Sequence, residues 1–332
     1  MRYKIVAVFL AAFLAFPICV HAADELYLGG DSVGIEVRYD GVMVTGTYAI
    51  QIDGALYDPK DHGISNGDMI VSVNDVSVST LEELHQQLMK YKNDTNQIPV
   101  TIKHGDQTRS ETLLTKYSNV DHTFQSGLYV KDKITGVGTL TFYDPVHETF
   151  GALGHEIYDS DQQQIADIHD GTLYASDVTS FTPAQKNIAG EKHAKILYDE
   201  IIGSIDKNTK IGIYGTYDTI KQDIRKLPWA KQEEIHTGTA EIYTVLDNKT
   251  IESYSINITK LHPQSEMDMK GIEFEVDDER LLSKTNGIIQ GMSGSPIVQD
   301  GKIVGAITHV ITSKPINGYG VYIEWMLKEA NE

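Results

Sequence analysis

The chain has little cysteine and little positive charge, and both shortages narrow its chemistry. Cys19 is the single cysteine, and it lies in an N-terminal apolar run. Without that run, no thiol would remain for a disulfide, a cysteine nucleophile or a metal-binding thiolate. The chain has 28 Lys and Arg against 47 Asp and Glu, a formal net charge of −19, and no basic cluster reverses this balance locally. Because such a surface repels phosphate backbones and anionic lipid heads, we expect no nucleic acid partner.

The histidines also lack the pattern of a metal site. No two of the 12 have the helical i, i+4 spacing of zinc ligands with a carboxylate nearby. We therefore expect no metal and no other cofactor. The hydrophobic fraction of 41% is normal for a globular protein, and 332 residues suffice for about two domains that each bury a core.

The N-terminal segment has the pattern of an export signal. Two basic residues, Arg2 and Lys4, precede an apolar run from Ile5 to Val20 that Pro17 interrupts, and a small-residue cleavage pattern follows. The run is short for a membrane span, so residues 1–23 are interpreted as a secretory signal peptide, with an uncleaved membrane anchor as the alternative. Both interpretations predict an exported, extracytoplasmic protein, and the second also predicts membrane association.

Residues 31–116 have the pattern of a small α+β unit. Apolar residues alternate in Val33–Val37, in Gly41–Thr45 and again in Gly67–Val76, as in strands that bury one face. Two further strand-like segments, Val100–Lys103 and Glu111–Leu114, flank a turn and predict a hairpin.

A helix is predicted between these strands. The segment Ser79-Thr80-Leu81-Glu82-Glu83 has the spacing of a capping box, and Leu81, Leu84 and Leu88 fall on one helical face. We therefore expect a helix over about residues 81–91. The leucines could line a groove or simply belong to the core.

This order of elements resembles a PDZ domain of the bacterial, permuted type. The likeness rests on Gly63–Ile70, on the strand that follows and on the helix that starts near Ser79. A PDZ domain binds an extended peptide, often a C-terminus, as an added strand beside an exposed edge. The resemblance implies an edge strand at Val42–Thr45, with peptide C-termini or segments of the chain itself as ligands. The residues expected at the groove are Tyr39, Asp40, Gly41, Val42, Leu81, Leu84 and Leu88.

From about Ser118 onward, short β-like segments alternate with turn residues. One example is Ile303–Val310, which follows the hairpin signal Asp300-Gly301. This composition is typical of a β-barrel or β-sandwich, and we place the domain boundary near Tyr117.

The run Gly291-Met292-Ser293-Gly294-Ser295-Pro296 has the form in which trypsin-like hydrolases present a nucleophile. Gly291 allows a turn in which the backbone N–H groups of Gly291 and Ser293 face one oxyanion, and Gly294 leaves room for substrate. The alternative is a surface turn without chemistry. A serine nucleophile needs a base, so the partners of Ser293 decide between the two.

A histidine and an acid can be proposed from position. His155 follows a short apolar segment with small residues and glycines, whose close-packed backbone would hold an imidazole rigidly, as a general base requires. His309 is the alternative base. Asp277 and Asp278 are the nearest aspartates upstream of Ser293, and either could accept the histidine Nδ1–H. Either could instead cap a short helix that starts at residue 279.

Taken together, the chain resembles the SpoIVB-type serine peptidases of endospore-forming bacteria. The blocks that carry the resemblance are Gly136–Phe142 with Asp144-Pro145, Gly151–His155, Leu281–Thr285, Gln290–Pro296 and Gly301–Val310. The resemblance implies a PDZ domain at 31–116 followed by a trypsin-like double β-barrel peptidase at 117–332, so the expected fold is mostly β with a small α+β module. It also implies His155, Asp278 and Ser293 as the catalytic residues, with Asp277 as the rival acid.

The same resemblance implies a regulatory function. Members of this family are exported into the space between mother cell and forespore, where limited cleavage of a membrane-complex regulator activates an intramembrane protease pathway. We therefore expect a serine endopeptidase that acts on protein or peptide substrates. The alternative is a catalytically inactive, PDZ-containing adaptor that only binds peptides.

Overall fold

Strands dominate the chain, as the sequence predicts. The structure is a computed structural model that describes residues 25–92, 95–120, 122–218 and 225–332. The expected signal segment 1–23 lies outside these residues. No described helix is both long and apolar enough to cross a membrane.

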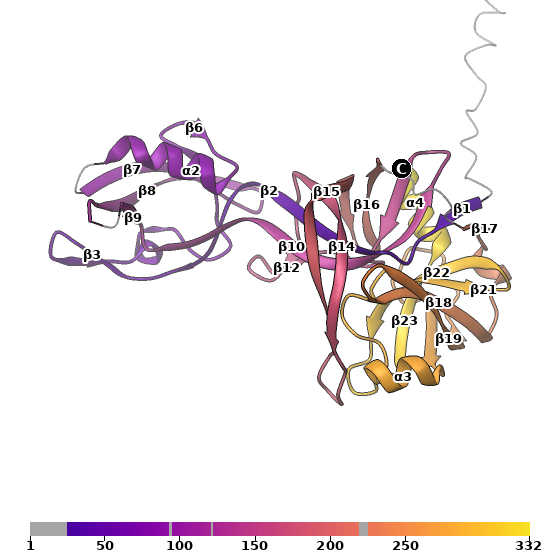
Figure 1. Ribbon diagram of the computed structural model, residues 1–332. Coiled ribbons are helices and arrows are strands. Elements are labelled where there is room, and N and C mark those ends of the chain that lie inside the picture. Colours follow the sequence, from indigo (N-terminus) through magenta and orange to yellow (C-terminus); the bar gives the residue numbers. More distant parts are fainter. Residues whose placement is uncertain (1–24, 93–94, 121, 219–224) are drawn as a thin grey trace, which may run out of the picture.

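A first ring of strands closes through antiparallel pairings. In ring order its strands are β2 (Ser32–Thr47), β10 (Leu128–Asp144), β11 (Thr149–Ala152), β16 (Gly212–Tyr217), β15 (Glu191–Thr209) and β14 (Asp170–Thr182). Alternating apolar side chains such as Val33, Ile35 and Val37 point into its buried core. This ring forms the upper part of the right-hand body in Figure 1.

A second ring is a closed barrel built from the C-terminal part of the chain. Its strands in order are β18 (Gly238–Asp247), β19 (Thr250–Leu261), β20 (Ile272–Val276), β23 (Asn317–Tyr322), β22 (Lys302–Val310) and β21 (Pro296–Gln299). The predicted hairpin between β21 and β22 is confirmed, since Asp300 and Gly301 adopt φ angles of 50° and 77°. Helix α3 (Glu279–Thr285) lies at the lower end of this barrel in Figure 1.

The two barrels share a buried apolar interface. Helix α4 (Ile323–Asn331) contacts β11 and β16 of the first barrel and β22 and β23 of the second. Its Met326 packs in one cluster with Phe142 and Ala306, together with Leu26 of strand β1 (Glu25–Leu28). Strand β17 (Lys226–Pro228) pairs with β1, and the short helix η3 (Gln232–Glu234) precedes β18. This shared core fixes the barrels against each other.

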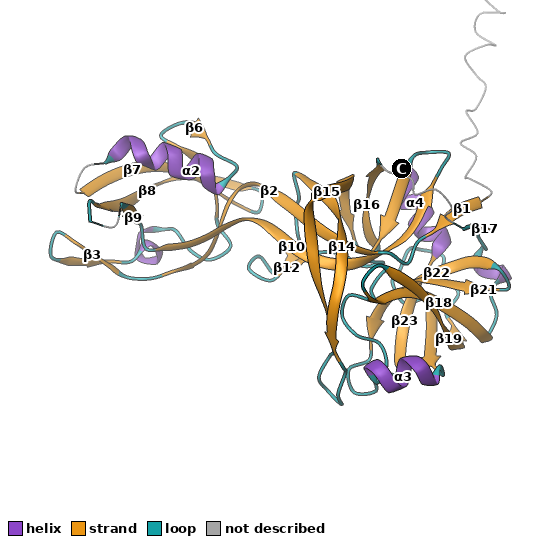
Figure 2. Cartoon of the chain, in the orientation of Figure 1, coloured by secondary structure: helices purple, strands orange, loops and turns teal. Residues whose placement is uncertain are grey.

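A separate lobe extends from the first barrel on the two long strands β2 and β10 (Figures 1 and 2). Its further elements are β3 (Ile50–Ile52), β4 (Ala55–Tyr57), η1 (Pro59–His62), β5 (Met69–Val73), β6 (Val76–Ser77), α2 (Leu81–Leu88), η2 (Met89–Tyr91), β7 (Thr95–His104), β8 (Gln107–Ser118) and β9 (Thr123–Gln125). The predicted helix and hairpin are both confirmed. Thr80 and Glu83 form the capping box.

The predicted domain boundaries differ from the structure. Val33–Val37 and Gly41–Thr45 belong to one continuous strand, β2, whose first half pairs with β10 and β14 inside the first barrel. The lobe is therefore an insertion between two barrel strands, not a domain that ends before the peptidase begins. Local alternation identified the strand segments, but it could not reveal that their partners lie about a hundred residues away.

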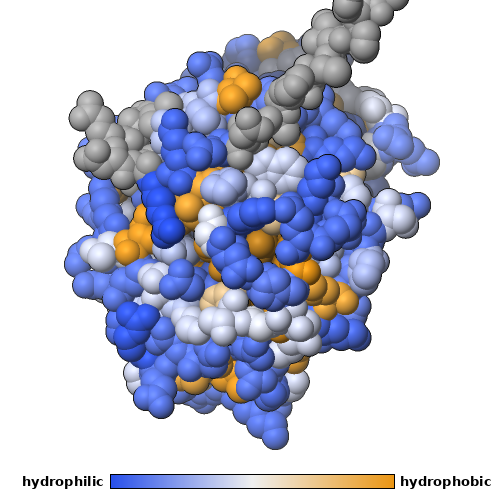
Figure 3. Space-filling view, turned by 90° about the vertical axis from the view of Figure 1, so that its right-hand side faces the viewer, coloured by the Kyte–Doolittle hydropathy of each residue, from blue (hydrophilic) through white to orange (hydrophobic). Residues whose placement is uncertain are grey.

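Most of the visible surface is polar. In the face shown in Figure 3, hydrophilic residues predominate and hydrophobic ones form small areas between them. This agrees with a chain that has many more charged residues than a buried core could hold.

Candidate active site

The nucleophile loop takes its shape from two glycines. Gly291 and Gly294 have φ angles of +90° and +89°, in the left-handed region that side chains disfavour. A Cβ atom at Gly294 would also lie 2.1 Å from the Thr139 carbonyl oxygen of the first barrel. The Gly-x-Ser-Gly spacing thus fits Ser293 into a turn pressed against β10.

The peptide groups of this loop are almost completely hydrogen bonded. The donors to its carbonyls are Lys192 N for Gln290, Thr139 Oγ1 for Gly291, Ser295 N for Met292, Thr139 N for Ser293 and Thr141 Oγ1 for Gly294. The N–H groups of Gln290, Met292, Gly294 and Ser295 donate to carbonyls in turn. Among the N–H groups from Gln290 to Ser295, only those of Gly291 and Ser293 have no acceptor in the described part of the chain. These are the two donors predicted for an oxyanion.

A cavity of about 580 Å³ brings the candidate residues together. Ser293 and Gly291 line it from the second barrel side, and His155 lines it from the first. Most of its wall is apolar, with Ile35 and Ile289 among the lining residues. A cleft of this kind can hold an extended peptide while it limits access of water.

His155 is held in the tautomer that a general base needs. It follows Leu153 and Gly154, with φ angles of 68° and 70°, and the left-handed conformation at a leucine is strained. The imidazole Nδ1–H donates to the Glu156 carbonyl at 2.7 Å. Because a carbonyl can only accept, Nδ1 carries a proton, and in the neutral imidazole Nε2 is then the nitrogen with the lone pair.

The serine hydroxyl has a different partner in this state. Ser293 Oγ donates to the Thr308 carbonyl at 3.1 Å, and among the described residues no hydrogen bond joins it to His155. Catalytic hydrogen bonds of this type are often absent without substrate and form in the complex. A rotation about the serine Cα–Cβ bond would redirect the hydroxyl.

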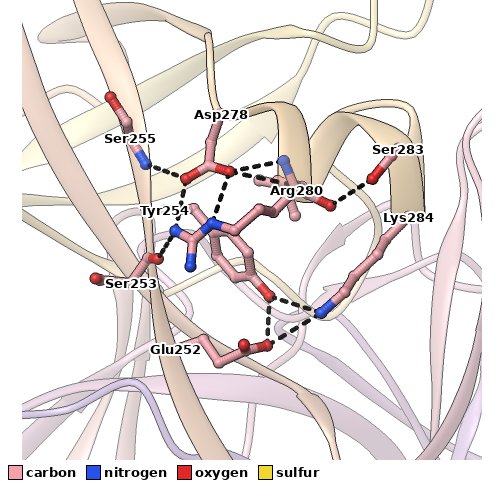
Figure 4. Close-up of polar contacts among 9 residues, drawn as sticks. Glu252, Ser253, Tyr254, Ser255, Asp278, Arg280, Ser283 and Lys284 are labelled. Carbon is pink, nitrogen blue, oxygen red and sulfur yellow. Dashed lines mark hydrogen bonds and ion pairs between the residues drawn. The ribbon is translucent and has the colours of Figure 1, made fainter.

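In this structure Asp278, the acid that the family resemblance implies, has no hydrogen bond to His155 among the described residues. Its carboxylate caps α3 by accepting from Arg280 N at 2.8 Å, and it also accepts from Ser255 N at 3.1 Å and Arg280 Nη2 at 2.7 Å (Figure 4). The Arg280 side chain is the main cause that lowers the pKa of Asp278 to about 2. Asp278 does not line the cavity, and neither does the exposed Asp277. The alternative of a helix cap is therefore the one that the structure supports.

His309 lies next to the candidate base. The ring centroids of His155 and His309 are 5.3 Å apart, with the planes at 46°. His309 follows Thr308, whose carbonyl holds the serine hydroxyl, and it lines the same cavity. In the sequence the two histidines are more than 150 positions apart, so only the fold makes them neighbours.

Sequence reasoning missed the residues behind the nucleophile loop. Thr139 and Thr141 are fully buried in β10 and donate their hydroxyls to the Gly291 and Gly294 carbonyls, each at 2.7 Å. Lys192 is buried beside them. The alternation of threonines in Gly138-Thr139-Leu140-Thr141 could have identified them. Polar residues that share the inward face of a strand need hydrogen-bond partners.

The predicted groove of the inserted lobe is partly misplaced. The expected edge strand is paired on both sides, for instance Val42 with Ile70 of β5 and Val44 with Val130 of β10. Tyr39 is buried and donates to Asp159 at 2.6 Å, while burial raises its pKa. A Cβ at Gly41 would lie 2.7 Å from the Met69 side chain, and the exposed Asp40 is 3.6 Å from His169.

A groove nevertheless exists beside the helix. Leu81, Leu84 and Leu88 line a cavity of about 310 Å³ together with Leu128 and Val130 of β10. The cavity therefore lies along the predicted face of the helix, but its other walls come mainly from β10 and β9 instead of residues 42–45. Helix and strand are tied together, because the Asp132 carboxylate of β10 accepts the Leu81 N–H at 2.8 Å.

In the described residues, no three histidine, cysteine or acidic side chains are grouped so that they could hold a metal ion. The cavity itself presents the Ser293 hydroxyl, the imidazoles of His155 and His309, and the two free amides of Gly291 and Ser293.

Comparisons with known proteins find distantly similar solved structures and one family. No curated protein matches the chain. Among solved structures, the active form of Rv3671c protease from M. tuberculosis has 12% identity and a TM-score of 0.33, over 60% of this chain and 75% of that one. The inactive form of Rv3671c protease has 11% identity and a TM-score of 0.33, over 59% and 85%.

The profile of the SpoIVB peptidase S55 family matches residues 122–327, which is more than half of the chain and includes both His155 and Ser293. This protein therefore belongs to the SpoIVB peptidase S55 family and is a serine peptidase.

Proposed function

We propose that the protein is a serine endopeptidase in which Ser293 is the nucleophile and His155 the general base. The observation that carries this proposal is the pair of free N–H groups at Gly291 and Ser293 in an otherwise saturated loop. Such preorganised donors stabilise the negative charge that develops on a peptide carbonyl during attack. They open onto the same cavity as the imidazole.

The reaction follows from these positions. When a substrate carbonyl enters the hole, the Ser293 hydroxyl turns from the Thr308 carbonyl to His155 Nε2, which takes its proton as Oγ bonds to the carbonyl carbon. The imidazolium then protonates the leaving amine, and a water molecule hydrolyses the acyl enzyme by the same route in reverse. The Glu156 carbonyl holds Nδ1–H throughout, as the orienting group of this site.

We infer that the two barrels form the double β-barrel of trypsin-like peptidases. Each ring has six strands, and the cleft receives His155 from the first barrel and Ser293 from the second. The shared cluster around Met326 would keep the two halves of the site in register.

We also propose that the inserted lobe is a PDZ-like peptide-binding module. From Leu128 to Lys131, β10 pairs only with β2 among the described residues, so its second edge is free for an added strand. Apolar side chains of α2 flank that edge. An extended peptide, from a substrate C-terminus or from the chain itself, could hydrogen bond to β10 and place its side chains against the helix.

We further propose that the cleavage is limited and regulatory, and takes place outside the cytoplasm. The support is the export pattern of residues 1–23 together with the resemblance to SpoIVB-type peptidases. In this proposal the substrate is a regulator in a membrane complex between mother cell and forespore. Its cleavage activates an intramembrane protease pathway during endospore formation.

Labelling with a fluorophosphonate probe tests the central claim. The wild-type protein should be labelled, and Ser293→Ala should lose both the label and any self-cleavage. Ser295→Ala is the matched control, because Ser295 is fully buried and its Oγ has no partner among the described residues. An unlabelled wild-type protein, or a label that persists in Ser293→Ala, would favour the inactive adaptor or another nucleophile.

A further inference from the structure

A buried lysine lies directly behind the nucleophile loop. Lys192 of β15 keeps only 3% of its surface exposed. Its Nζ donates to Thr244 Oγ1 of β18 at 2.7 Å and to Thr139 Oγ1 of β10 at 3.4 Å. No carboxylate in the described part of the chain pairs with this amine. Lysines are almost never fully buried without an anion, so the position calls for a reason beyond stability.

The lysine reaches the loop through Thr139. Thr139 Oγ1 accepts a hydrogen bond from Lys192 Nζ and donates one to the Gly291 carbonyl at 2.7 Å. The main-chain N–H of Lys192 donates to the Gln290 carbonyl at 2.9 Å. Lys192 therefore contacts both peptide groups that flank Gly291. Its N–H bonds to the Gln290 carbonyl directly, and its amine reaches the Gly291 carbonyl through the Thr139 hydroxyl.

Those two planes determine where the Gly291 N–H points. In a trans peptide the C=O and N–H groups point in opposite directions, so fixing the Gln290 carbonyl on β15 turns the Gly291 N–H away from β15. Glycine has the widest conformational freedom of all residues, so Gly291 keeps its φ of +90° only if the second plane is held as well. The Gly291 backbone also rests on the lysine stem, where an added Cβ would lie 3.0 Å from Lys192 Cβ.

We propose that Lys192 is a positioning residue for the oxyanion hole, holding Thr139 on the Gly291 carbonyl and thereby aiming the Gly291 N–H at the substrate. The inference rests on the proposed role of Ser293 as nucleophile. Lys192 would only preorganise the oxyanion hole, and Ser293 and His155 would carry out the bond-making and proton-transfer steps.

The buried amine lowers the stability of the folded protein. A purely structural role and a positioning role therefore predict different results when Lys192 is replaced. Burial lowers the pKa of Lys192 to about 7. A base whose pKa is lower in the folded state opposes folding at every pH below its unfolded value. If Lys192 had only a structural role, an apolar replacement of similar length should be harmless to catalysis and neutral or favourable to stability.

The test compares inactivation kinetics of the full chain with a fluorophosphonate probe, whose phosphoryl oxygen enters the oxyanion hole. For Lys192→Met we expect the maximal inactivation rate to fall by about 10-fold or more, with little change in the half-saturating probe concentration. The urea midpoint should stay the same or rise. Lys195→Met, an exposed lysine on the same strand, is the control and should match the wild type.

A second pair of variants keeps the test decisive if Lys192→Met folds poorly. Thr139→Val removes the hydroxyl that bonds to Gly291 and should reproduce the loss in rate, whereas Thr139→Ser should keep most of it. Wild-type rates in both Lys192→Met and Thr139→Val would overturn the inference while leaving the nucleophile assignment intact. A wild-type protein that is not labelled at all would instead sink the proposed function.

Discussion

The nucleophile side and the base side of the cleft are built differently. On the nucleophile side, all five carbonyls from Gln290 to Gly294 are bonded, and buried residues of the other barrel hold four of them by side chain or backbone. On the base side, the His155 ring has one hydrogen bond to the described residues, with the carbonyl of its own neighbour Glu156. In the proposed mechanism the oxyanion hole is thus preformed, whereas the orientation of the imidazole depends on a short local contact.

The base side also connects to the inserted lobe. The hairpin of β12 (Tyr158–Asp159) and β13 (Gln164–Ile165) follows His155 closely in the chain. Asp159 accepts from Tyr39 at 2.6 Å, and Asp161 accepts from Lys131 at 2.6 Å. Lys131 is the last residue of the β10 segment, Leu128 to Lys131, that forms the proposed groove edge. A peptide that binds to the lobe and shifts β2 or β10 would therefore disturb the segment that carries His155 before the loop that carries Ser293.

The largest expected effect comes from removing the base itself. His155→Gln should lower the rate of fluorophosphonate labelling by about 10³-fold or more, because the serine would lose its proton acceptor. His309→Gln should cost far less, since His309 only flanks the base. Both rates are measured on folded protein checked by circular dichroism. A larger loss in His309→Gln would exchange the two assignments.

A smaller effect is expected at Asp278, and on stability instead of chemistry. Asp278→Ala removes the cap of α3 and should lower the free energy of unfolding by about 1–2 kcal/mol. Asp278→Asn should leave labelling within a few-fold of wild type, as should the exposed control Asp277→Asn. If Asp278→Asn stays folded and loses labelling, its carboxylate must reach His155 in the catalytic conformation.

The stabilisation by Asp278 should depend on pH in a defined direction. Its pKa is lowered to about 2, so at acidic pH the unfolded chain takes up a proton that the folded protein does not. Stability from this group is therefore complete above about pH 4 and is lost as the pH falls towards 2. The difference between wild type and Asp278→Ala in urea midpoints should shrink over that range and stay constant above it.

The smallest expected effect lies at the contact between lobe and hairpin. Tyr39→Phe removes a buried hydrogen bond to Asp159 and should cost about 1 kcal/mol of stability. If the base side depends on this contact, labelling should also change by a few-fold. Lys133→Met is the control. It removes a more exposed ion pair with Glu36, which lies on the same strand as Tyr39. Equal labelling rates in wild type and Tyr39→Phe would show that the hairpin does not transmit the change.

Much of the fold was readable from local sequence. The capping box at Thr80 and Glu83, the turn at Asp300-Gly301 and the glycines around Ser293 all took the conformations predicted. Each depends on backbone angles or on side chains within a few positions. The nucleophile motif and the family of the chain belong to this class of information.

The tertiary structure alone decided which groups meet. Asp278 satisfies both the family spacing and the rules of helix capping, and only its contacts with Arg280 and Ser255 show which of the two it follows here. The wall of the groove is β10, and Lys192 lies behind the oxyanion hole, because strand pairing and barrel packing join segments far apart in the chain. Periodicity tells which face of a strand is buried, but the partner on that face is set by the closure of the barrels.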